Sequence, residues 1–149
     1  MPKEAAHWIL AEHVWQALPD GLLKREIQEN KVLFYLGSII FDTPYYVMIG
    51  QNRSNLKAAT QRLHGFEASR SFNPFGPLAK SPEILPEGYR PFLAGALTHV
   101  AADAVFHPLI YYFGGSDENV SANKAAQATA RHRRLETALD LHFLSRNGN

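Results

Sequence analysis

The chain has 149 residues, of which 46% are hydrophobic and 19% charged, proportions that indicate a globular domain with a core and exclude a disordered chain. Its formal net charge of +1 gives no strong signal for nucleic-acid binding. The absence of cysteine excludes disulfides and thiolate ligands, so histidine and carboxylate are the only strong ligands available for a transition metal.

The amino-terminal part of the sequence is expected to be helical. Apolar residues at helical spacing predict a helix from Glu4 to Leu18, and Leu22 to Glu29 predicts a shorter amphipathic one. The apolar run from Val32 to Asp42 predicts a third helix. It should end before Thr43, because the residue before Pro44 is driven out of the α region. This helix would present Asp42 at its end.

The rest of the sequence predicts three more helices and one long loop. A helix capped by Ser54 or Asn55 would run through Leu63 and His64, and a Pro-rich loop would occupy about residues 67–88. Further helices are expected from Tyr89 to Phe113, stopped by Gly114 and Gly115, and from Ser121 to Leu144. The expected fold is an all-α, single-domain helix bundle over residues 1–149.

Two segments are apolar enough to raise the question of a membrane. They are residues 31–50 and 92–113, and both carry acids or histidines, among them Asp42 and Asp103. We therefore expect two buried core helices and no transmembrane segment. The first residues lack the uninterrupted apolar run of a signal peptide, so a cytoplasmic location is expected.

A polar stripe within the second apolar segment is the first candidate site. His99, Asp103 and His107 recur at every fourth residue, which places them within about 80° of one another on a helix. Their neighbours on this helix are apolar, so burying the stripe without partners would be costly. The pattern predicts a metal site or a set of buried hydrogen bonds.

A second pair stands in the last predicted helix. His132 and Glu136 are four residues apart, a spacing that can offer a nitrogen and a carboxylate oxygen to one ion. The neighbouring arginines leave open a solvated helix face with charge pairs. His64 alone is more typical of a hydrogen-bonded core histidine, and His13 and His142 are expected at the surface because they are out of phase with the other histidines.

Taken in order, these residues resemble the zinc-dependent phospholipase C family, whose superfamily includes the zinc-dependent nucleases of fungi and plants. The matching pieces are AHWILA, LGSIIFD, LHGF, LTHVAADAVFHP and RHRRLE, which are spread over most of the chain. The resemblance implies an all-α fold of the phospholipase C and zinc nuclease type, with three metal ions bound in a cleft.

The resemblance also implies a ligand set. One zinc ion would be held by His64, His99 and Asp103. A second would be held by His107, His132 and Glu136. A third would share Asp103 with His7, but the family's secreted enzymes complete that site with a terminal tryptophan, whereas this sequence begins Met1-Pro2. Two ions are therefore expected, and other divalent metals would fit the same ligand types.

The implied activity is hydrolysis of a phosphodiester by a metal-activated water. Asp42 matches the family's aspartate near the attacking water and would act as the general base or orient that water. The substrate would be a lipid or another small phosphate ester, and Phe66, Phe72 and Phe75 could contact an acyl chain. A nuclease-like phosphodiesterase and a non-catalytic metal-binding module are the alternatives, and the sequence leaves the oligomeric state open.

Overall fold

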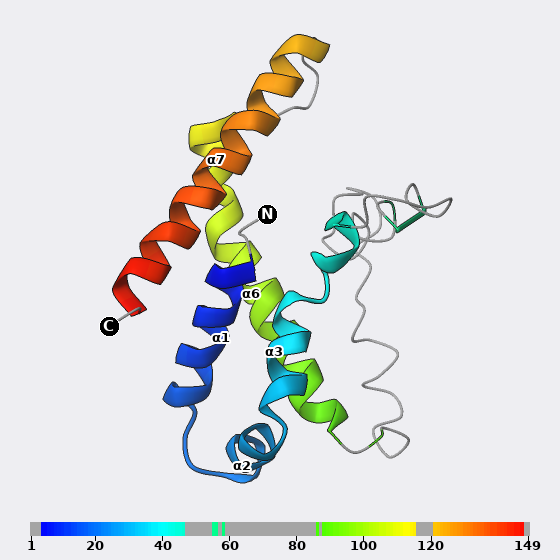
Figure 1. Ribbon diagram of the computed structural model, residues 1–149, viewed down its shortest axis with the longest axis vertical. Helices are drawn as coiled ribbons and strands as arrows, with labels where there is room; N and C mark the ends of the chain where they lie inside the picture. The colour runs from blue at the N-terminus through cyan, green and yellow to red at the C-terminus, as the bar shows by residue number, and fades with distance from the viewer. Residues whose placement is uncertain are drawn as a thin grey trace.

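The structure is a computed structural model that describes residues 4–46, 55–56, 58, 86, 88–115 and 121–147. Every element within these ranges is helical, which confirms the expected all-α fold (Figure 1). In chain order the elements are α1 (Glu4–Ala17), α2 (Leu22–Glu29), α3 (Lys31–Ile39), the 3-10 helix η1 (Thr43–Tyr46), α6 (Tyr89–Gly114) and α7 (Ala122–Asn147).

The ends of α1, α2, α6 and α7 agree closely with those predicted from the sequence. Helix α6 stops at Gly114, where Gly115 takes a φ of 85° that favours glycine and donates its N–H to the carbonyl of Tyr111 at 2.9 Å. The prediction for the third helix was wrong at its end, because α3 stops at Ile39 and the chain then tightens into turns that bond the N–H of Asp42 to Ile39 at 3.2 Å. Asp42 therefore lies in the turn between α3 and η1.

Two other predicted elements fall mainly where the structure gives no description. Asn55, Leu56 and Ala58 are helical, and the rest of the helix predicted from Ser54 or Asn55 lies outside the described residues. The same holds for most of the predicted loop over about residues 67–88.

Helix α6 is the axis of the arrangement. Figure 1 shows α3 crossing its amino-terminal half, α1 on the other side of that half, and α7 running along its carboxyl-terminal half. Ala11, Ile27 and Phe34 are fully buried between α1, α2 and α3, with Trp15, Leu18, Tyr35 and Ala94 packed against them. The core therefore fixes α1 and α3 on α6.

The closest helix contact depends on two glycines. A Cβ at Gly37 of α3 would lie 2.9 Å from the backbone nitrogen of Ala96 and even closer to the carbonyl oxygen of Phe92. A Cβ at Gly95 of α6 would lie 3.0 Å from the nitrogen of Ser38 and closer still to the carbonyl oxygen of Phe34. The two backbones touch where neither helix has a side chain.

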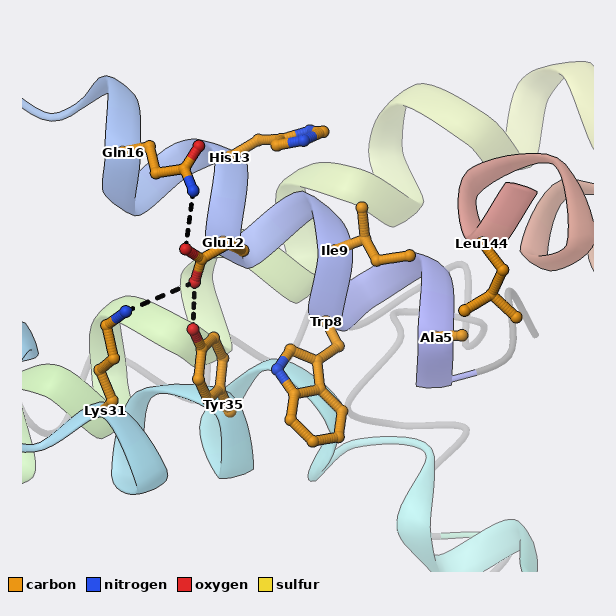
Figure 2. A pocket seen from close by; sticks show the side chains of 9 residues that line it. All are labelled: Ala5, Trp8, Ile9, Glu12, His13, Gln16, Lys31, Tyr35 and Leu144. Atoms are coloured by element: carbon orange, nitrogen blue, oxygen red, sulfur yellow. Dashed lines mark hydrogen bonds and ion pairs between the residues drawn. The ribbon is translucent and has the colours of Figure 1, made fainter. Parts of the chain in front are cut away.

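A polar cluster joins α1 to the start of α3 at the edge of a hollow of about 550 Å³ (Figure 2). The Tyr35 hydroxyl and the Gln16 amide both donate to the carboxylate of Glu12, and Lys31 lies 3.8 Å from the same group. Burial and then the Glu12 contact raise the pKa of Tyr35 to about 12. Burial also raises the pKa of Glu12, but its contacts with Tyr35, Gln16 and Lys31 outweigh burial, and the pKa of Glu12 is lowered.

Helix α6 is also the one described helix that is long and apolar enough to cross a membrane by length and composition, which is weak evidence by itself. Its inner side packs against α1, α2, α3 and α7. Only 33% of its most apolar window is buried, so the expectation of a buried core helix holds for one side alone.

Replacing Gly37 or Gly95 by alanine should destabilise the protein by about 1–3 kcal/mol, because the added methyl group collides with backbone. The higher helix propensity of alanine would act in the opposite direction by at most about 1 kcal/mol. Urea unfolding followed by circular dichroism measures the difference. Gly21→Ala is the control, since its Cβ would meet only the Pro19 oxygen at 3.9 Å. Equal stability of all three variants would contradict the close contact.

Replacing Glu12 by glutamine should lower stability near neutral pH but not in acid. A carboxyl whose pKa is lowered by folding stabilises the protein above its ordinary pKa of 4.5, and this contribution is lost as the pH falls through the folded value. The difference in unfolding free energy between the parent and Glu12→Gln should therefore shrink in acid. The exposed Glu29→Gln provides the control. A gap that stays constant with pH would count against the cluster.

Candidate metal centre

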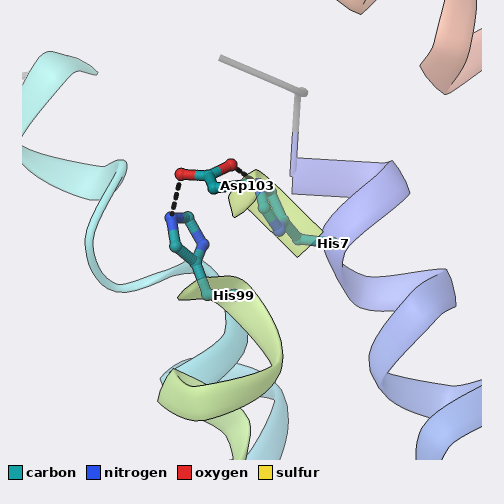
Figure 3. A group of neighbouring side chains, drawn as sticks. All are labelled: His7, His99 and Asp103. Atoms are coloured by element: carbon teal, nitrogen blue, oxygen red, sulfur yellow. Dashed lines mark ion pairs between the residues drawn. The ribbon is translucent and has the colours of Figure 1, made fainter. Parts of the chain in front are cut away.

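Three predicted ligands meet where α1 crosses α6. His7 of α1 and His99 and Asp103 of α6 offer ligand atoms that all lie within 4.8 Å of one another. Figure 3 shows the Asp103 carboxylate bridging the edges of the two rings, with Oδ1 3.4 Å from Nε2 of His7 and Oδ2 3.4 Å from Nε2 of His99. The two imidazoles stack with centroids 3.9 Å apart, and all three residues are buried.

Asp42 lies beside this first group. Its Oδ2 is 3.8 Å from Nε2 of His7 and its Oδ1 is 4.0 Å from Nε2 of His99, and only 2% of the residue is exposed. The turn after α3 places Asp42 there, so a second carboxylate faces the two histidines. The Asp42 and Asp103 carboxylates and the His7 and His99 rings therefore form one buried cluster.

The hydrogen bonding of His99 fixes its orientation. Nδ1 lies 2.9 Å from the backbone carbonyl oxygen of Ser38, which can only accept a hydrogen bond, so Nδ1 carries the proton. In the neutral ring Nε2 then presents a lone pair toward Asp103 and Asp42. A carbonyl that holds one imidazole nitrogen in this way is a common feature of histidine metal ligands.

A second group lies one helical turn further along α6. His107 of α6 and His132 and Glu136 of α7 bring three ligand atoms within 4.8 Å of one another. Nε2 of His132 lies 2.7 Å from Oε1 of Glu136, and the rings of His107 and His132 have centroids 5.8 Å apart. Glu136 is buried, whereas the side chains of His107 and His132 are 15% and 18% exposed.

Asp103 joins the two groups. Its Oδ1 lies 3.4 Å from His7 and 3.6 Å from Nε2 of His107. Burial alone would raise the pKa of Asp103, but the neighbouring side chains of His7 and His99 and the charge of His107 lower it well below its ordinary range. Asp103 is therefore an ionised carboxylate whose Oδ1 lies near a histidine of each group and whose Oδ2 faces His99 of the first group.

The donor set fits metal ions. Histidine nitrogen and carboxylate oxygen are the donors that zinc takes when thiolate is absent. Neither ring nitrogen of His7 makes a hydrogen bond among the described residues, although the ring is buried. A cation placed among these atoms would offset the cost of burying them. Each group thus offers a donor set that suits a metal ion.

A family model for zinc-dependent phospholipase C matches residues 6–148 of the chain. The chain belongs to this family. A comparison with curated proteins and one with solved structures each found no match. Membership in the zinc-dependent phospholipase C family confirms the resemblance seen in the sequence and agrees with the two ligand groups.

The structure brings together six of the seven predicted ligands, in a partly different grouping. The group of His107, His132 and Glu136 is the one expected for this family. His7 lies beside Asp103, as expected for the third ion, and also beside His99, while His64 lies outside the described residues. As expected, His13 and His142 are exposed.

Two groups that hold the predicted ligands in place could hardly be predicted from the sequence. The carbonyl of Ser38 is backbone, so its residue type says nothing of its role. Asp140 of α7 accepts a hydrogen bond from the N–H of Ala6 at 3.0 Å and is buried. In the sequence, only its place on the same helix face as Glu136 pointed to Asp140. The hydrogen bond ties the start of α1, and with it His7, to α7.

Replacing His132 by alanine should reduce the zinc content by about one ion per chain, because the second group then keeps only two ligands. Protein dialysed against zinc and analysed by plasma mass spectrometry gives the count. His142→Ala is the matched control, since it removes an exposed histidine from the same helix. Identical zinc content in the two variants would exclude His132 as a ligand.

Proposed function

We propose that this protein is a metal-dependent phosphoesterase that hydrolyses a phosphodiester in the manner of a phospholipase C. The observation that carries the proposal is Asp103, whose carboxylate contacts histidines of both ligand groups at 3.4–3.6 Å. Two adjacent groups with a shared carboxylate are the arrangement that a two-ion hydrolase needs. Family membership supports the same chemistry.

The ligand groups would hold zinc, which supplies Lewis acidity that lowers the pKa of water and neutralises phosphate charge. The first ion would lie on His7, His99 and Asp103, with His64 as a further ligand from outside the described residues. The second would lie on His107, His132 and Glu136. Other divalent metals suit the same donors.

The chain's own residues would position the reaction and move the proton. Asp42 would accept the proton of the attacking water on its carboxylate, since it is buried beside the first group without belonging to its three ligands. The Ser38 carbonyl would keep the His99 ring in its ligating tautomer. Asp140 would hold α1, and therefore His7, against the site.

A lipid phosphate ester is the substrate class that the family suggests. A nuclease-like phosphodiesterase would use the same groups on a nucleotide. We favour the lipid for two reasons. The family is one of phospholipases, and the net charge of +1 gives little general attraction for a polyanion. Zinc-loaded protein should release phosphorylcholine from phosphatidylcholine faster than it releases nucleotides from single-stranded DNA.

Replacing Asp42 by asparagine should lower the turnover of bis(p-nitrophenyl) phosphate by roughly 10²–10⁴-fold, the usual contribution of a general base. The zinc content should not change, because the three ligands of each group remain. Asp20→Asn is the charge-matched control, as the side chain of Asp20 is fully exposed.

The two measurements together separate the candidate functions. An Asp42→Asn protein as active as the parent would refute the role of Asp42. A parent protein that binds zinc but hydrolyses neither substrate would be a non-catalytic metal-binding module.

A further inference from the structure

Tyr111 of α6 contacts both histidines of the second ligand group without belonging to its three ligands. The centroid of its ring is 5.7 Å from that of His107 and 5.3 Å from that of His132. The two imidazoles are themselves 5.8 Å apart, so the three rings form a nearly equilateral triangle. One aromatic side chain therefore touches both imidazoles that this group offers to an ion.

Helical spacing explains why Tyr111 faces the ligands. It follows His107 by four residues, so the two side chains lie on the same side of α6, the side toward α7. The next two residues, Tyr112 and Phe113, are 81% and 66% exposed, whereas Tyr111 is partly buried. Of these three consecutive aromatic residues, Tyr111 is the one that contacts ligands.

The geometry of the contacts restrains the imidazole planes. The Tyr111 ring makes an angle of 61° with the ring of His107 and 62° with that of His132, and T-shaped pairs of this kind are a preferred arrangement of aromatic rings. An imidazole that rotates about its Cβ–Cγ bond changes this angle and weakens the contact. A histidine ligand must keep its ring plane in line with the ion, because the nitrogen lone pair lies in that plane.

The second group is the more open of the two, so its rings depend more on such a restraint. The side chains of His107 and His132 are 15% and 18% exposed, whereas those of His7 and His99 in the first group are 1% and 0% exposed. In the first group the Ser38 carbonyl orients His99. In the second group the described residues provide an aromatic ring that contacts both imidazoles.

The end of α6 that carries Tyr111 is held against α7. A Cβ on Gly114 would lie 3.4 Å from the backbone nitrogen of His132, so the two helices approach closely at this ligand. Nε of Arg131 donates to the Gly114 carbonyl oxygen at 2.9 Å. The Tyr111 carbonyl in turn accepts the N–H of Gly115 at 2.9 Å, which closes the last turn of α6. These contacts fix the place of the Tyr111 backbone relative to His132.

We propose that Tyr111 is a positioning residue for the second metal ion and holds the imidazoles of His107 and His132 in their ligating orientation. The aromatic ring carries this role, since ring atoms make both contacts. The proposal deepens the proposed function and rests on the second ligand group as a metal site. The competing interpretation is that Tyr111 only packs α6 against α7.

Zinc affinity, measured by competition with a chromophoric chelator, tests the role of the ring. Tyr111→Leu keeps an apolar side chain in the space but removes the ring, so it should weaken zinc binding at the second group by about tenfold or more. Tyr111→Phe keeps the ring and should bind zinc as tightly as the parent. Tyr112→Leu is the matched control, because it makes the same change at the exposed neighbouring tyrosine and should leave zinc affinity unchanged.

A second measurement separates positioning from packing. The His132→Ala variant has already lost the second site, so adding Tyr111→Leu to it should not change the affinity for the remaining ion. A packing residue would instead affect both ion sites through the fold. An equal loss of affinity for the remaining ion would therefore overturn the proposal.

Cobalt(II) in place of zinc provides a spectroscopic readout, because its visible absorption depends on the geometry of its ligands. The difference between spectra recorded without and with His132→Ala isolates the ion of the second group. This difference spectrum should change in Tyr111→Leu and stay the same in Tyr111→Phe and Tyr112→Leu.

Several results would overturn the role of Tyr111. Parent-like zinc affinity in Tyr111→Leu would do so, and so would an equal loss of affinity in the Tyr112→Leu control. A Tyr111→Phe protein that binds zinc as weakly as Tyr111→Leu would show that the hydroxyl group acts and the ring does not.

The positioning proposal and the catalytic proposal fail separately. A parent protein with no more bound zinc than the His132→Ala variant would refute the second ion and the role of Tyr111 together. A parent that binds both ions but hydrolyses no phosphodiester would refute the activity alone. The affinities and cobalt spectra of the Tyr111 variants would still decide the role of Tyr111 in that protein.

Discussion

The backbones of α3 and α6 touch at Gly37 and Gly95, and the position of the first ligand group depends on this contact. The contact brings the Ser38 carbonyl within 2.9 Å of His99, which sets the tautomer of that histidine. It also brings the turn after α3 close enough for Asp42 to reach the same histidine. A methyl group in the contact would therefore move a ligand and a candidate base together.

The amino-terminal helix completes the site through a second long-range contact. Asp140 accepts the N–H of Ala6, one residue before His7, and it lies one turn beyond Glu136 on the same helix. Helix α7 thus supplies His132 and Glu136 to the second group and positions the first residues of α1 for the first group. The two groups are coupled through the helices that carry them as well as through Asp103.

The sequence predicted what depends on periodicity and missed what depends on tertiary distance. The spacing of His99, Asp103 and His107 gave their common face, and the glycines after Phe113 gave the end of α6. Nothing local could show that His7 stacks on His99, since 92 positions separate them in the chain. Hydropathy indicated that α6 is apolar, but it reports composition and not direction, so one exposed side was not foreseen.

The unequal burial of the two groups implies a direction of entry. The first group and Asp42 are almost completely buried, whereas the side chains of His107 and His132 are 15% and 18% exposed. A phosphate ester would therefore meet the second group first, with Asp42 and the water on the inner side.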